Sequence, residues 1–181
     1  MNATHNLPDE YKIRKFNDAD LDKVVAINQA CLPENYSPTF FLELYRSFPD
    51  TFVVGEYNGE IIGYVMCRIE FGFSEMSRFK FARKGHIVSV AVMPQHRSKG
   101  IALAMLSQIL KTMVDRYKCS ETYLEVRVSN HSAINLYKKI GYRIEKKISR
   151  YYIDGEDAVL MHRQLPLETA NHNKANPASN G

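Results

Sequence analysis

The chain has 181 residues, of which 45% are hydrophobic and 24% are charged, so its composition is that of a folded domain and excludes a disordered chain. Its net charge of +4 is compatible with a phosphate-bearing ligand but is too small to indicate nucleic-acid binding by itself. No apolar run is long enough for a membrane span, and the three cysteines lack the close pairs of a zinc site, so we expect a metal-free cytoplasmic protein with reduced thiols.

The first half of the chain predicts a strand, two helices and a hairpin. Residues 1–10 are polar, and we expect them to be flexible. An alternating strand over 11–16 precedes a helix that ends at Pro33, and a short second helix is expected over 39–46. Asn58-Gly59 lies between two apolar runs and therefore predicts a β-hairpin with a type I′ turn.

The second half predicts alternating strands and helices. In order, its segments are a long loop over 71–84, a central strand over 85–93, an amphipathic helix over 100–117, a strand over 121–128, a short helix between Asn130 and Gly141, strands over 142–150 and 157–165, and a disordered tail over 166–181. The element order β-α-α-β-β-β-α-β-α-β-β predicts one mixed α/β domain over 11–165. Its middle strand-helix-strand unit is expected to form a parallel pair.

A basic loop joins the central strand to the long helix. Its sequence is Arg97-Ser98-Lys99-Gly100-Ile101-Ala102. The glycine lets a ligand approach the backbone, and the N–H groups at a helix N-terminus attract anions. A pyrophosphate fits such a place, but a short basic loop before a helix is as often a solvated connection, so both interpretations remain open.

The same loop has the Arg/Gln-x-x-Gly-x-Gly/Ala form of the GCN5-related N-acetyltransferase (GNAT) superfamily, and Asn130, Ala133 and Tyr137 resemble that family's second signature. The resemblance implies a mostly antiparallel sheet with a central parallel strand pair, helices on both faces, and acetyl-CoA as co-substrate. The CoA-binding residues that it implies are Val90, Ala91, Val92, Arg97, Ser98, Lys99, Gly100, Ile101, Ala102, Asn130, Ala133 and Tyr137.

Four further stretches resemble the catalytic subunit of NatA-type N-terminal acetyltransferases, with the archaeal single-chain members as the nearest fit. These stretches are 32–36, 83–89, 123–130 and 151–158. The resemblance implies acetyl transfer to the α-amine of protein N-termini by direct attack within a ternary complex. It favours Ser, Ala and Thr termini, with some Met-starting ones.

The same resemblance assigns the catalytic residues. An α-amine has a pKa of about 7.7–8.0, against about 10.4 for lysine, so modest base assistance is enough near neutral pH. His86 and Glu125 resemble the family's base positions, and Tyr137 would assist the departing thiolate. Considered alone, these residues also fit a structural histidine, a paired carboxylate and a core aromatic side chain.

Two segments are expected to receive the peptide. The substrate-binding residues that the resemblance implies are Leu32, Pro33, Glu34, Tyr36, Tyr151 and Tyr152. A carboxylate on the Pro-braced loop suits a peptide N-terminus. Adjacent residues of a strand point to opposite faces, so at most one of the two tyrosines is expected to face the peptide if the strand pairing is regular.

Other functions remain possible from the sequence. One is a GNAT enzyme that acetylates lysine side chains or a small amine, and another is a weakly catalytic CoA-binding or ribosome-associated module. Association with the ribosome is compatible with this interpretation, and no membrane partner is expected. The basic runs over 78–84 and 138–150 are interpreted as charge on solvated faces, so no specific nucleic-acid binding is expected.

Overall fold

The computed structural model describes residues 7–74 and 80–166, so the expected flexibility of residues 1–6 and of the tail from residue 167 lies outside the described residues. Its main elements are β1 (Tyr11–Lys15), α1 (Leu21–Cys31), α2 (Pro38–Ser47), β2 (Phe52–Tyr57), β3 (Glu60–Phe73), β4 (Phe81–Val92), α3 (Ile101–Asp115), β5 (Glu121–Arg127), α4 (His131–Lys139), β6 (Arg143–Ile148) and β7 (Ala158–Gln164). This order confirms the predicted succession of strands and helices. None of the helices in the described ranges is long and apolar enough to cross a bilayer.

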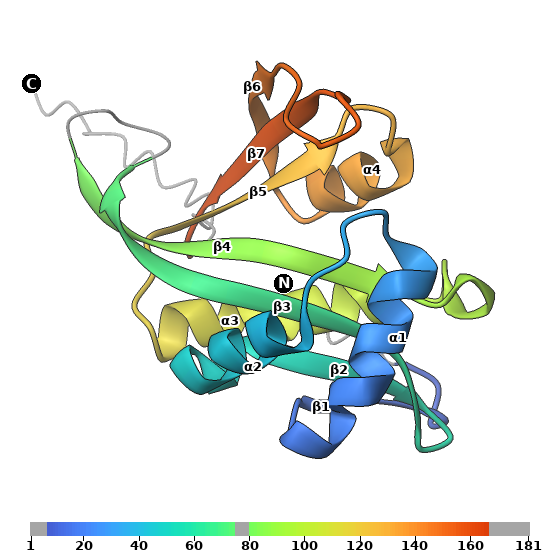
Figure 1. Cartoon of the computed structure of the whole chain (residues 1–181). Coiled ribbons are helices and arrows are strands. Elements are labelled where there is room, and N and C mark those ends of the chain that lie inside the picture. The colour runs from blue at the N-terminus through green and yellow to red at the C-terminus, as the bar shows by residue number, and fades with distance from the viewer. Residues whose placement is uncertain (1–6, 75–79, 167–181) are drawn as a thin grey trace, which may run out of the picture.

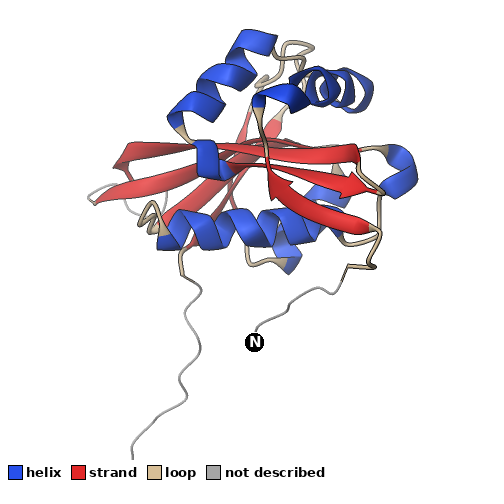
Figure 2. Cartoon of the chain, turned by 90° about the horizontal axis from the view of Figure 1, so that it is seen from below, coloured by secondary structure: helices blue, strands red, loops and turns tan. Residues whose placement is uncertain are grey.

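The strands form one sheet in the order β1-β2-β3-β4-β5-β7-β6, with helices on both faces (Figures 1 and 2). Neighbouring strands are antiparallel except for the parallel pair β4–β5, which confirms the expected mixed sheet. The apolar residues of α1 and α2 pack on one face, and those of α3 and α4 pack on the other. The sheet therefore separates two hydrophobic cores.

The stripe of apolar residues on α3 explains why this helix lies flat against the sheet. Met105, Ile109 and Met113 are spaced four residues apart and are fully buried. Burial of each such side chain contributes about 1.5–3 kcal/mol. Gly85 on β4 allows the close approach, because a Cβ atom there would lie 2.3 Å from the Met113 sulfur.

The strands β4 and β5 separate after a short paired stretch. Only Lys84–His86 pair with Glu121–Tyr123, although both strands continue beyond this point. Figure 1 shows the two strands diverging on the side of α4. Within the described part of the chain, β4 has no strand partner on its β5 side from residue 87 onward. The divergence leaves backbone groups of β4 free to bind a ligand.

The hairpin between β3 and β4 is longer than predicted. Phe71 pairs with Arg83 and Phe73 pairs with Phe81, so most of the loop expected over 71–84 is strand. The prediction was wrong because the mixed aromatic and basic residues obscured a β pattern: alternate phenylalanines stack across the two strands and stabilise the pairing. Residues 75–79 lie outside the described residues.

Candidate active site

A cavity of about 230 Å³ lies where β4 and β5 diverge, between the α1–α2 loop and the β6–β7 loop. All the predicted catalytic and substrate-binding residues, together with four of the predicted CoA-binding residues, line this one cavity, although they come from distant parts of the sequence. They are Leu32, Pro33, Glu34, Tyr36, His86, Val90, Glu125, Asn130, Ala133, Tyr137, Tyr151 and Tyr152. The cavity is therefore the candidate active site.

The two candidate bases are in contact inside the cavity. His86 on β4 pairs with Tyr123 on β5, and the two rings stack with their centroids 4.3 Å apart. The His86 Nε2 atom lies 2.7 Å from the Glu125 carboxylate, which projects from β5 two residues further along. The parallel pairing of the strands thus brings together a histidine and a carboxylate that are 39 residues apart in the sequence.

A second carboxylate, which the sequence did not indicate, lies on the other side of His86. Glu70 on β3 places a carboxylate oxygen 3.6 Å from His86 Nδ1, within ion-pair distance but too far for a hydrogen bond. The Tyr123 hydroxyl donates to Glu70 at 2.7 Å, and Arg68 donates to it at 2.5 Å. No sequence signal marks Glu70, because it falls just before the loop expected over 71–84.

The electrostatics of the three groups are coupled. Burial disfavours the charged imidazolium, but the hydrogen bond with Glu125 and the contact with Glu70 outweigh burial and raise the pKa of His86. The contact with His86 in turn lowers the pKa of Glu70 to about 2, with help from the Tyr123 hydroxyl. His86 therefore needs a higher pH than an ordinary histidine to become neutral, while Glu70 stays ionised.

Tyr137 on α4 lines the same cavity from the side of the core that α3 and α4 cover. Within the described ranges its hydroxyl has no hydrogen-bond partner, and its ring packs against Tyr142. Burial raises the pKa of Tyr137, so the hydroxyl keeps its proton and can donate a hydrogen bond to a negative atom. Asn130 begins this helix by accepting a hydrogen bond from the Ala133 N–H at 3.1 Å, as predicted for a cap.

The predicted CoA-binding loop lies beyond the end of β4. Gly100 precedes α3 with a φ of 83°, and Ser98 also has a positive φ of 61°. No side chain caps α3 at Gly100, so its first N–H groups remain available to an anion. The Arg97 Nε atom donates to the Val92 carbonyl at 2.9 Å, which fixes the loop against the strand.

Eight of the predicted CoA-binding residues lie outside the cavity wall. They are Ala91, Val92, Arg97, Ser98, Lys99, Gly100, Ile101 and Ala102. Among them, Ala91, Val92 and Ile101 have buried side chains, so only their backbone groups can contact a ligand.

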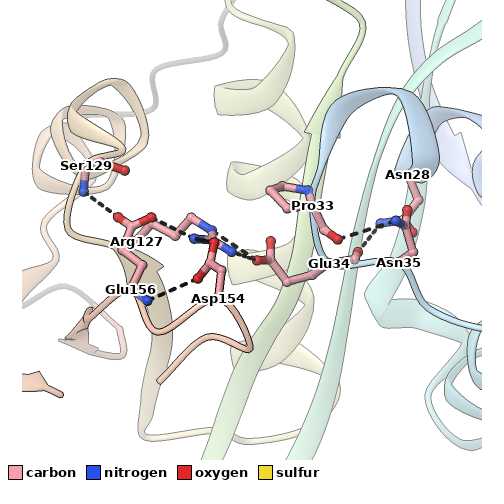
Figure 3. Close-up of polar contacts among 8 residues, drawn as sticks. All are labelled: Asn28, Pro33, Glu34, Asn35, Arg127, Ser129, Asp154 and Glu156. Carbon is pink, nitrogen blue, oxygen red and sulfur yellow. Dashed lines mark hydrogen bonds and ion pairs between the residues drawn. The ribbon is translucent and has the colours of Figure 1, made fainter. Parts of the chain in front are cut away.

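The mouth of the cavity contains an arginine cluster (Figure 3). Arg127, at the end of β5, donates to Glu34 at 2.5 and 3.0 Å, to Asp154 at 2.8 Å and to Glu156 at 2.6 Å. Only 14% of its side chain is exposed. The Ser129 N–H also donates to Glu156. Arg127 therefore joins the α1–α2 loop to the β6–β7 loop, a link between residues 93 positions apart that sequence analysis did not indicate.

Asn28 holds the other side of the α1–α2 loop. Its side chain is fully buried, donates to the Glu34 carbonyl at 3.0 Å and accepts from the Tyr36 N–H at 3.1 Å. It also donates to the Tyr64 hydroxyl. The loop that carries Glu34 is therefore anchored through both its backbone and its carboxylate.

The two adjacent tyrosines are not strand residues. Tyr151 and Tyr152 lie in the connection between β6 and β7, and both line the cavity. The Arg127 guanidinium lies over the Tyr152 ring, 4.1 Å from its centroid. The expectation that at most one of the two tyrosines faces the peptide was tied to regular strand pairing, which does not hold in this connection, and both side chains line the cavity.

The chain is similar in sequence to known acetyltransferases. Residues 21–142 match the model of the acetyltransferase (GNAT) family. The chain is 48% identical to the N-alpha-acetyltransferase of Sulfurisphaera tokodaii, over 86% of this chain and 94% of that protein.

Two solved structures show the same fold. The structure of Chaetomium thermophilum Naa20 with a bisubstrate analogue matches with a TM-score of 0.75 and 32% identity, over 84% of this chain and 86% of that one. A chain of the NatB acetyltransferase complex bound to CoA and MES matches with a TM-score of 0.70 and 28% identity, over 86% and 99%.

Proposed function

Because the chain belongs to the acetyltransferase (GNAT) family and is an acetyl-CoA-dependent protein N-terminal acetyltransferase, we propose that it acetylates small N-termini (Ser, Ala and Thr) and some Met-starting ones by direct attack in a ternary complex. The observation that carries this proposal is the position of the His86–Glu125 pair in a cavity between the free edge of β4 and two anchored loops. The proposed site of action is the cytoplasm, with ribosome association as a further proposal.

The residues present fit acetyl-CoA. The unpaired edge of β4 offers N–H groups near Val90–Val92 to an extended chain, as an added strand would use them, and the loop before α3 offers N–H groups to a pyrophosphate. Bound acetyl-CoA supplies the acetyl group. The free N–H groups of β4 also lie where they can stabilise negative charge on a thioester oxygen.

Three cavity residues then have proposed roles in the transfer. The amine nitrogen bonds to the thioester carbon, the carbon–sulfur bond breaks, and the amine loses one proton. His86 and Glu125 accept this proton, through ordered water if the amine lies further away. Tyr137 donates a hydrogen bond to the departing thiolate, because its raised pKa favours donation over release of the proton.

The charge of the mouth supports an N-terminal amine as substrate. Glu34, Asp154 and Glu156 share the single guanidinium of Arg127, so the arginine cluster keeps a net negative charge. An α-ammonium group is attracted to such a surface before it loses its proton. The small volume of the cavity favours a small first side chain.

Two peptides of otherwise equal sequence test the proposal. One has a free Ser N-terminus and no lysine, and the other has a blocked N-terminus and one internal lysine. We expect CoA release from acetyl-CoA with the first peptide only, measured by thiol titration and by the added mass of the peptide. Release only with the blocked peptide would establish the lysine-directed alternative, and release with neither would establish a weakly catalytic binding module.

Replacing Glu70 by Gln should move the acid limb of the pH–rate profile to lower pH. In the native protein Glu70 helps to raise the pKa of His86, so neutral His86 appears only at raised pH. Without this carboxylate the pKa of His86 falls, and the neutral base forms at lower pH. The measurement is kcat/KM for the Ser peptide against pH, with Glu145→Gln as the control. An unmoved limb would show that His86 is not the titrating base.

A further inference from the structure

A buried chain of hydrogen bonds runs beneath the α1–α2 loop, from α1 through β3 to β4. Asn28 on α1 and Tyr64 on β3 are fully buried, and Ser89 on β4 is 6% exposed. The Asn28 Nδ2 atom lies 3.0 Å from the Tyr64 hydroxyl, which in turn lies 2.8 Å from the Ser89 hydroxyl. Ser89 also lines the cavity of the candidate active site. The chain of hydrogen bonds therefore begins in the core and ends at a cavity residue.

The direction of these hydrogen bonds is fixed at Asn28. The Asn28 amide accepts from the Tyr36 N–H and donates to the Glu34 carbonyl, so its oxygen and nitrogen cannot be exchanged. One of its two amide hydrogens goes to the Glu34 carbonyl, and the other goes to the Tyr64 oxygen. The Tyr64 oxygen is therefore the acceptor of the hydrogen bond with Asn28.

The single proton of the Tyr64 hydroxyl is then donated to Ser89. Burial raises the pKa of Tyr64 to about 12, so the hydroxyl keeps this proton. Within residues 7–74 and 80–166, Ser89 is the only remaining hydrogen-bond partner of the Tyr64 hydroxyl. The opposite direction would leave the Tyr64 donor unpaired in the core, which is costly. The Ser89 oxygen is thus the acceptor of this hydrogen bond.

The proton of Ser89 itself is left without an acceptor. Among the residues that the structure describes, the Ser89 hydroxyl bonds to Tyr64 and to no other group. Its bond to the buried Tyr64 places Ser89 at the inner wall of the cavity, on the side of the sheet that α1 covers. A hydroxyl there can donate to an oxygen atom of a bound substrate.

We propose that Ser89 donates a hydrogen bond to the side-chain hydroxyl of an N-terminal Ser or Thr and thereby favours these residues over N-termini of equal size that lack a hydroxyl. This inference rests on the proposed function and names a residue that selects within its substrate class. The amine must reach the His86–Glu125 pair, and the rest of the peptide leaves through the mouth of the cavity. The first side chain is therefore the part of the peptide that reaches the inner wall.

The test uses the full chain and two peptides that differ only in the first residue, which is Ser or α-aminobutyrate, where a methyl group replaces the hydroxyl. The measured quantity is the ratio of the two kcat/KM values. In the Ser89→Ala variant we expect this ratio to fall about 2- to 10-fold below that of the native protein, as for the loss of one neutral hydrogen bond. Both peptides are measured on the same preparation, so partial unfolding of a variant cancels from the ratio.

The matched control is Tyr64→Phe, which removes the same hydrogen bond from its other side and leaves the Ser89 proton in place. We expect it to lower kcat/KM equally for both peptides, because Asn28 holds the α1–α2 loop less firmly, and to keep the native ratio. An unchanged ratio in Ser89→Ala would overturn this inference alone, and so would an equal fall of the ratio in both variants. Failure of the native protein to acetylate either peptide would refute the proposed function and this inference together.

Discussion

The double variant Glu125→Gln with His86→Phe is expected to lower kcat for the Ser peptide by at least about 100-fold, while its affinity for acetyl-CoA stays unchanged. A positioned general base contributes about 10²- to 10⁴-fold. The low end applies here, because part of an α-amine population is already neutral near pH 7.5. The two side chains lie 2.7 Å apart, so either can hold the proton when the other is removed, and both must be replaced. The measurements are steady-state kinetics and acetyl-CoA titration calorimetry.

The chain contains a matched control for this variant. His162 on β7 also pairs with a glutamate, Glu145, at 3.1 Å, and its side chain is only 14% exposed. The double variant His162→Phe with Glu145→Gln loses an equivalent pair outside the cavity and should keep its turnover. Native turnover in the Glu125/His86 variant would show that the base is assigned to the wrong residues.

Replacement of Arg127 by Met is expected to lower kcat/KM for the peptide by about 100-fold, mainly through a higher peptide KM. The variant leaves Glu34, Asp154 and Glu156 without their shared cation, so the carboxylates repel one another and the two loops separate. Displacement of a positioning group by about 1 Å is enough to cost about 10²-fold. The KM for acetyl-CoA should change little, because Arg127 does not belong to the loop before α3.

Two further variants separate geometry from charge and from general destabilisation. Arg127→Lys keeps the charge but loses the planar fork that reaches several carboxylates, so we expect an intermediate loss. Arg14→Met removes an arginine that also binds two carboxylates, Asp20 and Glu56, but on β1. It should lower the melting temperature without changing the peptide KM. A peptide KM that rises equally in both methionine variants would contradict a specific role for Arg127.

The order of elements could be predicted because it depends on local signals. The spacing of apolar residues, the helix caps and the turns each depend on residues that are close in the sequence. The four-residue spacing on α3 and the Asn130 cap both occur as expected. The length of the β3–β4 hairpin could not be predicted, because Phe71 and Phe73 become strand residues only through pairing with the segment that follows. The strands predicted over 142–150 and 157–165 already leave Tyr151 and Tyr152 between them, but the sequence did not show that both side chains would line the cavity.

The candidate site was predictable where the family motifs identify it and not where partners come from distant strands. Strand alternation alone places Glu125 and Arg127 on the same face of the strand expected over 121–128. That the carboxylate would meet His86, and the arginine Glu34, depends on which strands and loops become neighbours in space. Glu70 had no motif at all, and only its pairing position opposite Lys84 and beside His86 reveals it.

The separation of β4 from β5 coincides with an irregularity in the other pairing of β4. Ser89 pairs with Met66 and Ile87 with Cys67, so Val88 is an extra residue in the ladder between β3 and β4. As a consequence β4 changes phase at this point. Up to Val88, the even-numbered residues of β4, such as His86, face the side of the sheet that α1 covers. Beyond Val88, odd-numbered residues such as Ala91 face that side. Loss of Val88 would restore a single phase along β4. If the strand kept the register of its far half, His86 would then turn toward α3, and the base would leave the cavity although His86 itself had not been replaced.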